Sequence, residues 1–113
     1  MAEHIKIRPA SGTWVVRVAG AVIGESKAAL ELTEGEYPPV IYFPRDDIAM
    51  AFLDPSDTES TCPYKGNASY YSIAAKSGTI PDAVWSYEAP KAGVEKIKDY
   101  LAFNPNKVTV EEV

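Results

Sequence analysis

The sequence ASYYSIAAKSGTIPDAVWSYE, residues 68–88, carries the strongest structural signal in this 113-residue chain. In its second half Trp85 and Tyr87 alternate with Ser86, and apolar residues at every second position are typical of a β-strand. Ser77-Gly78 is a turn signal between two such segments. The stretch therefore predicts a β-hairpin, with strands over 68–74 and 83–88.

Alternation with the same period predicts strands on both sides of the hairpin. Ile5 and Ile7 flank Lys6 near the N-terminus, and a short apolar run follows Pro38-Pro39. Apolar residues recur with a period of about 3.6 residues in only two segments, which we predict to be short helices. A polar segment before the hairpin predicts a loop. The further strands are expected over 5–8, 14–18, 27–33, 40–43 and 108–110, the two short helices near 45–53 and 92–100, and the loop over 54–66.

These elements predict a mainly β protein whose strands pair predominantly in antiparallel fashion. The chain is long enough for one hydrophobic core and too short for two comfortable domains, so we expect residues 1–113 to form a single domain. Hydrophobic residues make up 46% and charged residues 24% of the sequence, which is typical of a folded, soluble protein.

The net charge and the numbers of Cys and His residues limit which partners, metals and cofactors we expect. The formal net charge of −5 leaves few cations to neutralise phosphates, so we expect no nucleic-acid partner. The N-terminus is charged and no apolar stretch reaches membrane-spanning length, so we expect no membrane partner and a cytoplasmic location. One Cys and one His are too few for a structural zinc site, and we expect no metal and no cofactor. A homo-oligomer is compatible with the sequence.

Four sequence blocks follow one another along the chain. They are Tyr42-Phe43-Pro44-x-x-Asp47, Thr61-x-Pro63-Tyr64-Lys65-Gly66-x-Ala68-x-Tyr70, Trp85-Ser86-Tyr87-Glu88-x-Pro90 and Ala102-Phe103. With these blocks the chain resembles, from about residue 5 to residue 110, the bacterial family numbered 427 among the domains of unknown function.

The resemblance implies a compact domain of two antiparallel sheets. It is similar to the β-tent of B-type methionine sulfoxide reductases and of the drug-binding domain of cereblon. The family has carried a nucleotidyltransferase-like label with no established activity behind it. Gly24-Glu25-Ser26 stands where Ala-Asp-Ser is typical of the family, so a role for an aspartate at that place does not carry over.

The segment Thr61–Gly66 contains the most unusual chemistry of the chain. Pro63 and Gly66 restrict the backbone on either side of Lys65, which could form an anion-binding corner at the mouth of a cleft. The alternative is a turn whose lysine extends into solvent. On the first interpretation, Lys65→Met should abolish ligand binding and leave the melting temperature nearly unchanged.

Two residues of this segment are candidate catalytic groups. Cys62 could be a nucleophile if Lys65 or Arg45 stabilised its thiolate, and Tyr64 could take part in the same chemistry. The alternative is a cysteine that packs in the core or lines the site, because no second cysteine is present to resolve a sulfenic acid.

Aromatic residues and a second cation could complete the cleft. Trp85 and Tyr87 share a strand face, where they either form a wall for a flat or apolar ligand or fill the core. Arg45 either contacts the ligand or forms a surface ion pair. The ligand-binding candidates are therefore Arg45, Cys62, Tyr64, Lys65, Trp85 and Tyr87.

Three functions are compatible with these residues. The favoured one is a small-molecule-binding domain that holds a polar or anionic ligand in a cleft around Thr61–Gly66. The second is an enzyme that uses the same cleft, with Cys62 or Tyr64 in the chemistry. The third is a protein-interaction module without catalysis. A buried Cys62 with no cation nearby would count against the enzyme.

Overall fold

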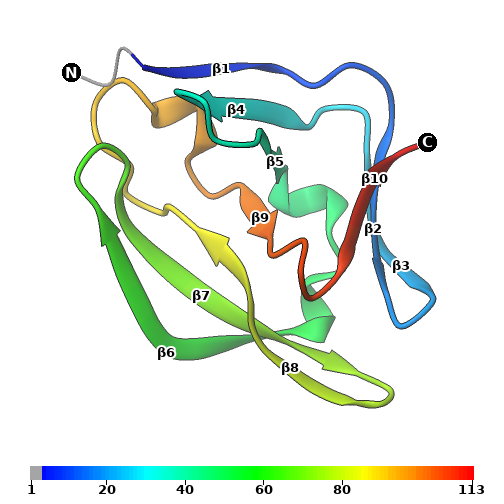
Figure 1. Cartoon of the computed structure of the whole chain (residues 1–113). Helices are drawn as coiled ribbons and strands as arrows, with labels where there is room; N and C mark the ends of the chain where they lie inside the picture. The colour runs from blue at the N-terminus through cyan, green and yellow to red at the C-terminus, as the bar shows by residue number, and fades with distance from the viewer. Residues whose placement is uncertain (1–3) are drawn as a thin grey trace.

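The computed structural model describes residues 4–113 and contains ten strands in that range (Figure 1). The strands are β1 (Ile5–Pro9), β2 (Trp14–Val18), β3 (Ala21–Ser26), β4 (Leu30–Glu34), β5 (Val40–Phe43), β6 (Leu53–Cys62), β7 (Gly66–Ala75), β8 (Gly78–Ser86), β9 (Leu101–Phe103) and β10 (Thr109–Glu112). Three 3-10 turns of three residues each accompany them, η1 (Arg45–Asp47), η2 (Met50–Phe52) and η3 (Glu95–Ile97). Within the described residues, no helix is long and apolar enough to cross a membrane.

The strands form two antiparallel sheets. The larger sheet has seven strands in the order β1-β4-β5-β9-β8-β7-β6, and the smaller has three in the order β10-β2-β3. In Figure 1 the larger sheet curves from β1 and β4 at the top, through β5 and β9 in the centre, to β7 and β6 at the lower left. The smaller sheet stands at the right. The prediction of a mainly β fold with two antiparallel sheets is confirmed.

Two cores of buried side chains lie on opposite faces of the larger sheet. The first core joins the two sheets and contains Phe43 and Val84 of the larger sheet together with Val16 of the smaller. The second core contains Tyr42 of β5 and is covered in part by Ile97 of η3. Because successive side chains of a strand point to opposite faces, the neighbours Tyr42 and Phe43 belong to different cores.

The segment predicted as a helix over 45–53 forms only the two turns η1 and η2. Ile48, between them, has extended backbone angles and forms an isolated antiparallel bridge with Gly24. The Ala49 N–H donates to the Ile23 carbonyl oxygen at 2.8 Å. This link to the smaller sheet uses backbone groups that an α-helix would need. The segment 92–100 likewise contains only η3.

The prediction of a loop over 54–66 is wrong, because strand β6 extends to Cys62 and pairs with β7. β6 lies at the edge of the sheet and most of its side chains are exposed, so it has no buried face to impose alternation. Polar contacts hold it instead. Ser56 and Thr58 donate hydrogen bonds to the two carboxylate oxygens of Asp82 on β8, at 2.5 and 2.7 Å.

Other strands also differ from the prediction, and β8 covers Gly78–Ser86 in place of 83–88. The strand expected over 27–33 begins at Leu30 and ends at Glu34. β3 and β9 were not predicted at all. Gly24 interrupts the apolar pattern of β3, and β9 is only three residues long and buried throughout, so it has no alternation to detect.

Candidate functional site

A cavity of about 320 Å³ lies on the second-core face of the larger sheet. Aromatic side chains from three strands and their ends form part of its walls: Tyr42 of β5, Tyr70 of β7, and Trp85 of β8 with Tyr87 directly after that strand. Glu34 at the end of β4 and Lys65 of the β6–β7 turn close one side. Strands that are distant in sequence therefore share one hollow.

The floor of the cavity is a row of residues that face one another across the sheet. Tyr42 pairs with Ala102 of β9, Ala102 pairs with Trp85, and Trp85 pairs with Tyr70. Ala102 is fully buried between Tyr42 and Trp85 in this row. The Trp85 indole Nε1 donates to the Tyr42 hydroxyl at 3.3 Å.

Tyr87 supplies an unused hydroxyl to this cavity. Its side chain is only 6% exposed, and its hydroxyl has no hydrogen-bond partner among residues 4–113. No fully buried side-chain oxygen or nitrogen of the described chain lacks a partner, so this hydroxyl keeps some exposure to solvent. Burial raises the pKa of Tyr87 above its usual value, so the phenol stays protonated and can donate. Burial also raises the pKa of Tyr42, to about 12.

Lys65 reaches the cavity, but its charge is paired. Its Nζ donates to Oε1 of Glu34 at 2.6 Å, and the two side chains are 11% and 21% exposed. The His4 Nε2 lies 3.5 Å from the other Glu34 oxygen. The Lys65 hydrogen bond holds the pKa of Glu34 below its usual value, although burial opposes the shift. The geometry is therefore that of a neutralised pair, not of a free anion-binding corner.

Cys62 ends β6 opposite Gly66 and packs against the second core, where it is partly buried. No cationic side chain forms a hydrogen bond with its sulfur in the part of the chain that the structure describes. Because Lys65 is committed to Glu34, the thiol lacks the neighbour that activates a nucleophilic cysteine.

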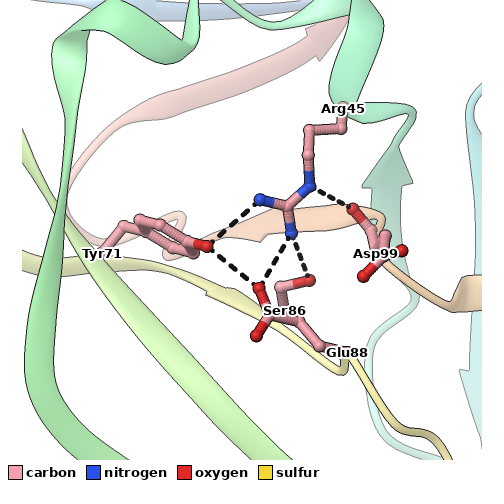
Figure 2. Close-up of polar contacts among 5 residues, drawn as sticks. All are labelled: Arg45, Tyr71, Ser86, Glu88 and Asp99. Atoms are coloured by element: carbon pink, nitrogen blue, oxygen red, sulfur yellow. Dashed lines mark hydrogen bonds and ion pairs between the residues drawn. The ribbon is translucent and has the colours of Figure 1, made fainter.

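Arg45 belongs to a separate polar cluster, which Figure 2 shows. Its Nε donates to the Asp99 carbonyl oxygen at 3.0 Å, its Nη1 to the Tyr71 hydroxyl at 3.1 Å, and its Nη2 to the Ser86 Oγ at 3.1 Å. Glu88 lies 3.4 Å from Nη2 and accepts a hydrogen bond from Tyr71 at 3.0 Å. All three guanidinium nitrogens are engaged, so Arg45 joins η1 to β7, β8 and the turn at Asp99.

Every residue of the cavity lies within residues 6–113, the segment matched by a family model described as a domain of unknown function (DUF427). The chain belongs to the DUF427 family. A search of curated proteins returned no match. Asp47, the last residue of the first family block, has a structural role in this DUF427 domain. It accepts a hydrogen bond from Ser26 Oγ at 2.6 Å and so joins η1 to β3.

The DUF427 domain brings only some of the predicted site residues together. Lys65, Trp85 and Tyr87 line one cavity, and Cys62 packs against the same core. Tyr64 is exposed outside the cavity lining, and its ring meets the edge of His4 with centroids 4.5 Å apart.

Arg45 is not brought together with Lys65. Its partner Ser86 sits between Trp85 and Tyr87 on β8, so by alternation it faces the opposite side of the sheet from the cavity. A ligand contact by Arg45 would therefore need a second site. Among residues 4–113, no group of three or more His, Cys, Asp or Glu side chains is arranged to hold a metal ion.

Several cavity residues were not among the predicted site residues, including Tyr42, Glu34 and Tyr70. Tyr42 lies in an apolar run that indicates only a buried strand, and Glu34 directly follows the strand predicted over 27–33, where no pattern marks it as a site residue. Tyr70 could have been predicted, because it alternates with Ser69 on a predicted strand and is therefore an aromatic residue on one strand face. In the structure it lies opposite Trp85.

Proposed function

We propose that this DUF427 domain binds a small, flat, uncharged molecule in the aromatic cavity. The observation that carries the proposal is the Tyr87 hydroxyl, which is nearly buried, protonated and without a partner among the described residues, in a hollow walled by other aromatic rings. Because this hydroxyl is not fully buried, water can pair with it, and an acceptor on a ligand would take the place of that water.

Size and lining support a small-molecule site. Ligand pockets usually measure roughly 300–1,000 Å³ and combine apolar or aromatic walls with a few polar groups. The cavity, at about 320 Å³, fits the lower end of that range. Trp85, Tyr70 and Tyr42 offer ring faces and edges for a planar molecule.

The charges favour a neutral ligand over an anionic one. Lys65 and Glu34 neutralise one another at 2.6 Å, and the third charged lining residue, Asp82, accepts hydrogen bonds from Ser56 and Thr58 and would repel an anion. An anion would have to compete with Glu34 for Lys65, and a cation would have to compete with Lys65 for Glu34. We assign no catalytic step to the site, because among residues 4–113 no cationic side chain forms a hydrogen bond with the Cys62 sulfur and Lys65 is paired with Glu34.

Calorimetric titration with benzamide and benzoate tests this proposal. The two probes share a planar ring and differ mainly in charge, so we expect benzamide to bind and benzoate to bind more weakly. Tyr87→Phe should lower the affinity for benzamide about 3- to 10-fold, the usual contribution of one hydrogen bond. Tyr64→Phe is the matched control, because this exposed ring lies outside the cavity lining and its loss of a hydroxyl should change nothing.

Two results would contradict the proposal. One is the absence of benzamide binding to the wild-type protein at any soluble concentration. The other is equal affinity of Tyr87→Phe and the wild type, because the Tyr87 hydroxyl would then contribute nothing to recognition.

A further inference from the structure

A second cavity, of about 310 Å³, adjoins the first. Trp14 and Val110 of the smaller sheet line it, together with Ile41 and Phe103 of the larger sheet. Trp85 forms part of the wall of both cavities, and so does Val40. The two hollows therefore border the same two side chains.

The pairing of β5 with β9 explains how cavities on two faces of a sheet can border the same side chains. The two strands pair only at Tyr42–Ala102 and Phe43–Leu101. Val40 and Ile41 continue β5 and pair with β4, but they have no partner on β9. The larger sheet is thus unpaired between β5 and β9 beyond Tyr42, beside the position where Trp85 borders both hollows.

The second cavity offers few free polar groups. Its one charged lining residue, Glu31, accepts a hydrogen bond from Arg8 Nε at 2.9 Å. The Trp14 indole Nε1 donates to the Ser11 carbonyl oxygen at 3.0 Å. With these groups already paired, the cavity suits a hydrocarbon group better than a polar one.

We infer that the two cavities form one bipartite site, in which the first holds a flat polar head and the second holds an apolar chain of the same ligand. This inference rests on the proposed function, because it takes the aromatic cavity as the site of the head. The chain leaves the head beside Trp85 and Val40 and ends between the sheets, against Val110 and Phe103. The ligand class is therefore a planar amide or similar head that carries an alkyl substituent.

Benzamide and 4-hexylbenzamide are the probes that test the inference. Each buried methylene raises affinity roughly fourfold, so the hexyl chain should improve binding at least about tenfold even if it is only partly buried. Val110→Phe fills the second cavity without touching the first, so it should remove this gain and leave benzamide binding unchanged. In the wild-type protein, nuclear Overhauser effects should join the terminal methyl of the chain to Val110 and Phe103, a measurement that does not depend on the variant folding.

The possible outcomes separate the two proposals. Three results would overturn the bipartite site while benzamide binding still supports the head site. One is equal affinity of benzamide and 4-hexylbenzamide, and another is a gain in affinity from the hexyl chain that survives in a folded Val110→Phe variant. The third is nuclear Overhauser contacts between the hexyl chain and residues outside the second cavity. Failure of benzamide itself to bind would overturn the proposed function, and this inference with it.

Discussion

At the scale of single residues, the ion pair of Lys65 and Glu34 closes one side of the aromatic cavity. The side chains are largely shielded from water, and each is the nearest opposite charge of the other. Removal of Lys65 leaves the Glu34 carboxylate partly buried with only His4 nearby, 3.5 Å from its other oxygen, which is more costly than loss of an exposed pair.

Lys65→Met should therefore lower the free energy of unfolding by about 2 kcal/mol, between the effects seen for exposed and for fully buried pairs. This reverses the expectation from sequence that the substitution leaves the melting temperature nearly unchanged. Urea denaturation measures the change. The double variant Lys65→Met with Glu34→Leu should recover part of the loss, and a single variant as stable as the wild type would show that the pair contributes nothing.

The same pair should make stability depend on pH in the acid range. The pKa of Glu34 is held below its usual 4.5 in the folded protein, chiefly by the Lys65 hydrogen bond. Its contribution to the free energy of unfolding is therefore complete above about pH 4.5 and is lost as the pH falls through the folded pKa. The stability difference between wild type and Glu34→Gln should shrink in that window. A difference that stays constant from neutral to acid pH would rule this contribution out.

At the scale of elements, the turn between β6 and β7 holds Lys65 in place. Gly66, which begins β7, has a φ of +110°, and its backbone passes close to the Ala89 carbonyl oxygen. The Lys91 N–H donates to the Lys65 carbonyl oxygen at 3.0 Å, so the turn is fixed against the segment that follows β8.

Gly66→Ala should destabilise the protein by about 2–3 kcal/mol, because it adds a steric contact to the strain of a positive φ. A Cβ at this position would lie 3.3 Å from the Ala89 oxygen. Gly78→Ala is the matched control: its φ is +126° but nothing lies within 4 Å, so only the strain remains and the loss should be about 1 kcal/mol. Thermal unfolding of both variants compares the losses, and equal values would argue against the steric contact.

Sequence predicted those elements whose apolar residues follow a regular local pattern. β7 and β8 lie on either side of the turn predicted at Ser77-Gly78, and they pair with Tyr70 opposite Trp85. β6 was missed because an exposed edge strand has no buried face, and η1 and η2 were taken for one helix because only the fold shows that Ile48 bridges to Gly24. Such elements depend on contacts between distant segments.

At the scale of the whole molecule, the curved sheet decides which candidate residues meet. Trp85 and Tyr87 were predicted as a shared strand face, and Lys65 as a turn residue near it, since local patterns define both. The partner of Lys65 was not predictable, because Glu34 comes from a strand thirty-one residues away in sequence. The contact of Arg45 with Ser86, on the opposite face of that strand, was not predictable either, because the two residues are distant in sequence.

The central claim is that the aromatic cavity is a ligand site, and the two indole N–H signals in a nitrogen-15 NMR spectrum test it most directly. The chain has two tryptophans, so a Trp14→Phe variant assigns both signals. Trp85 lines the aromatic cavity and donates to Tyr42 there, whereas Trp14 lines only the second cavity. Titration with benzamide should shift the Trp85 signal in a saturable way and leave the Trp14 signal in place. A Trp85 signal that does not move, or a shift confined to Trp14, would contradict the claim.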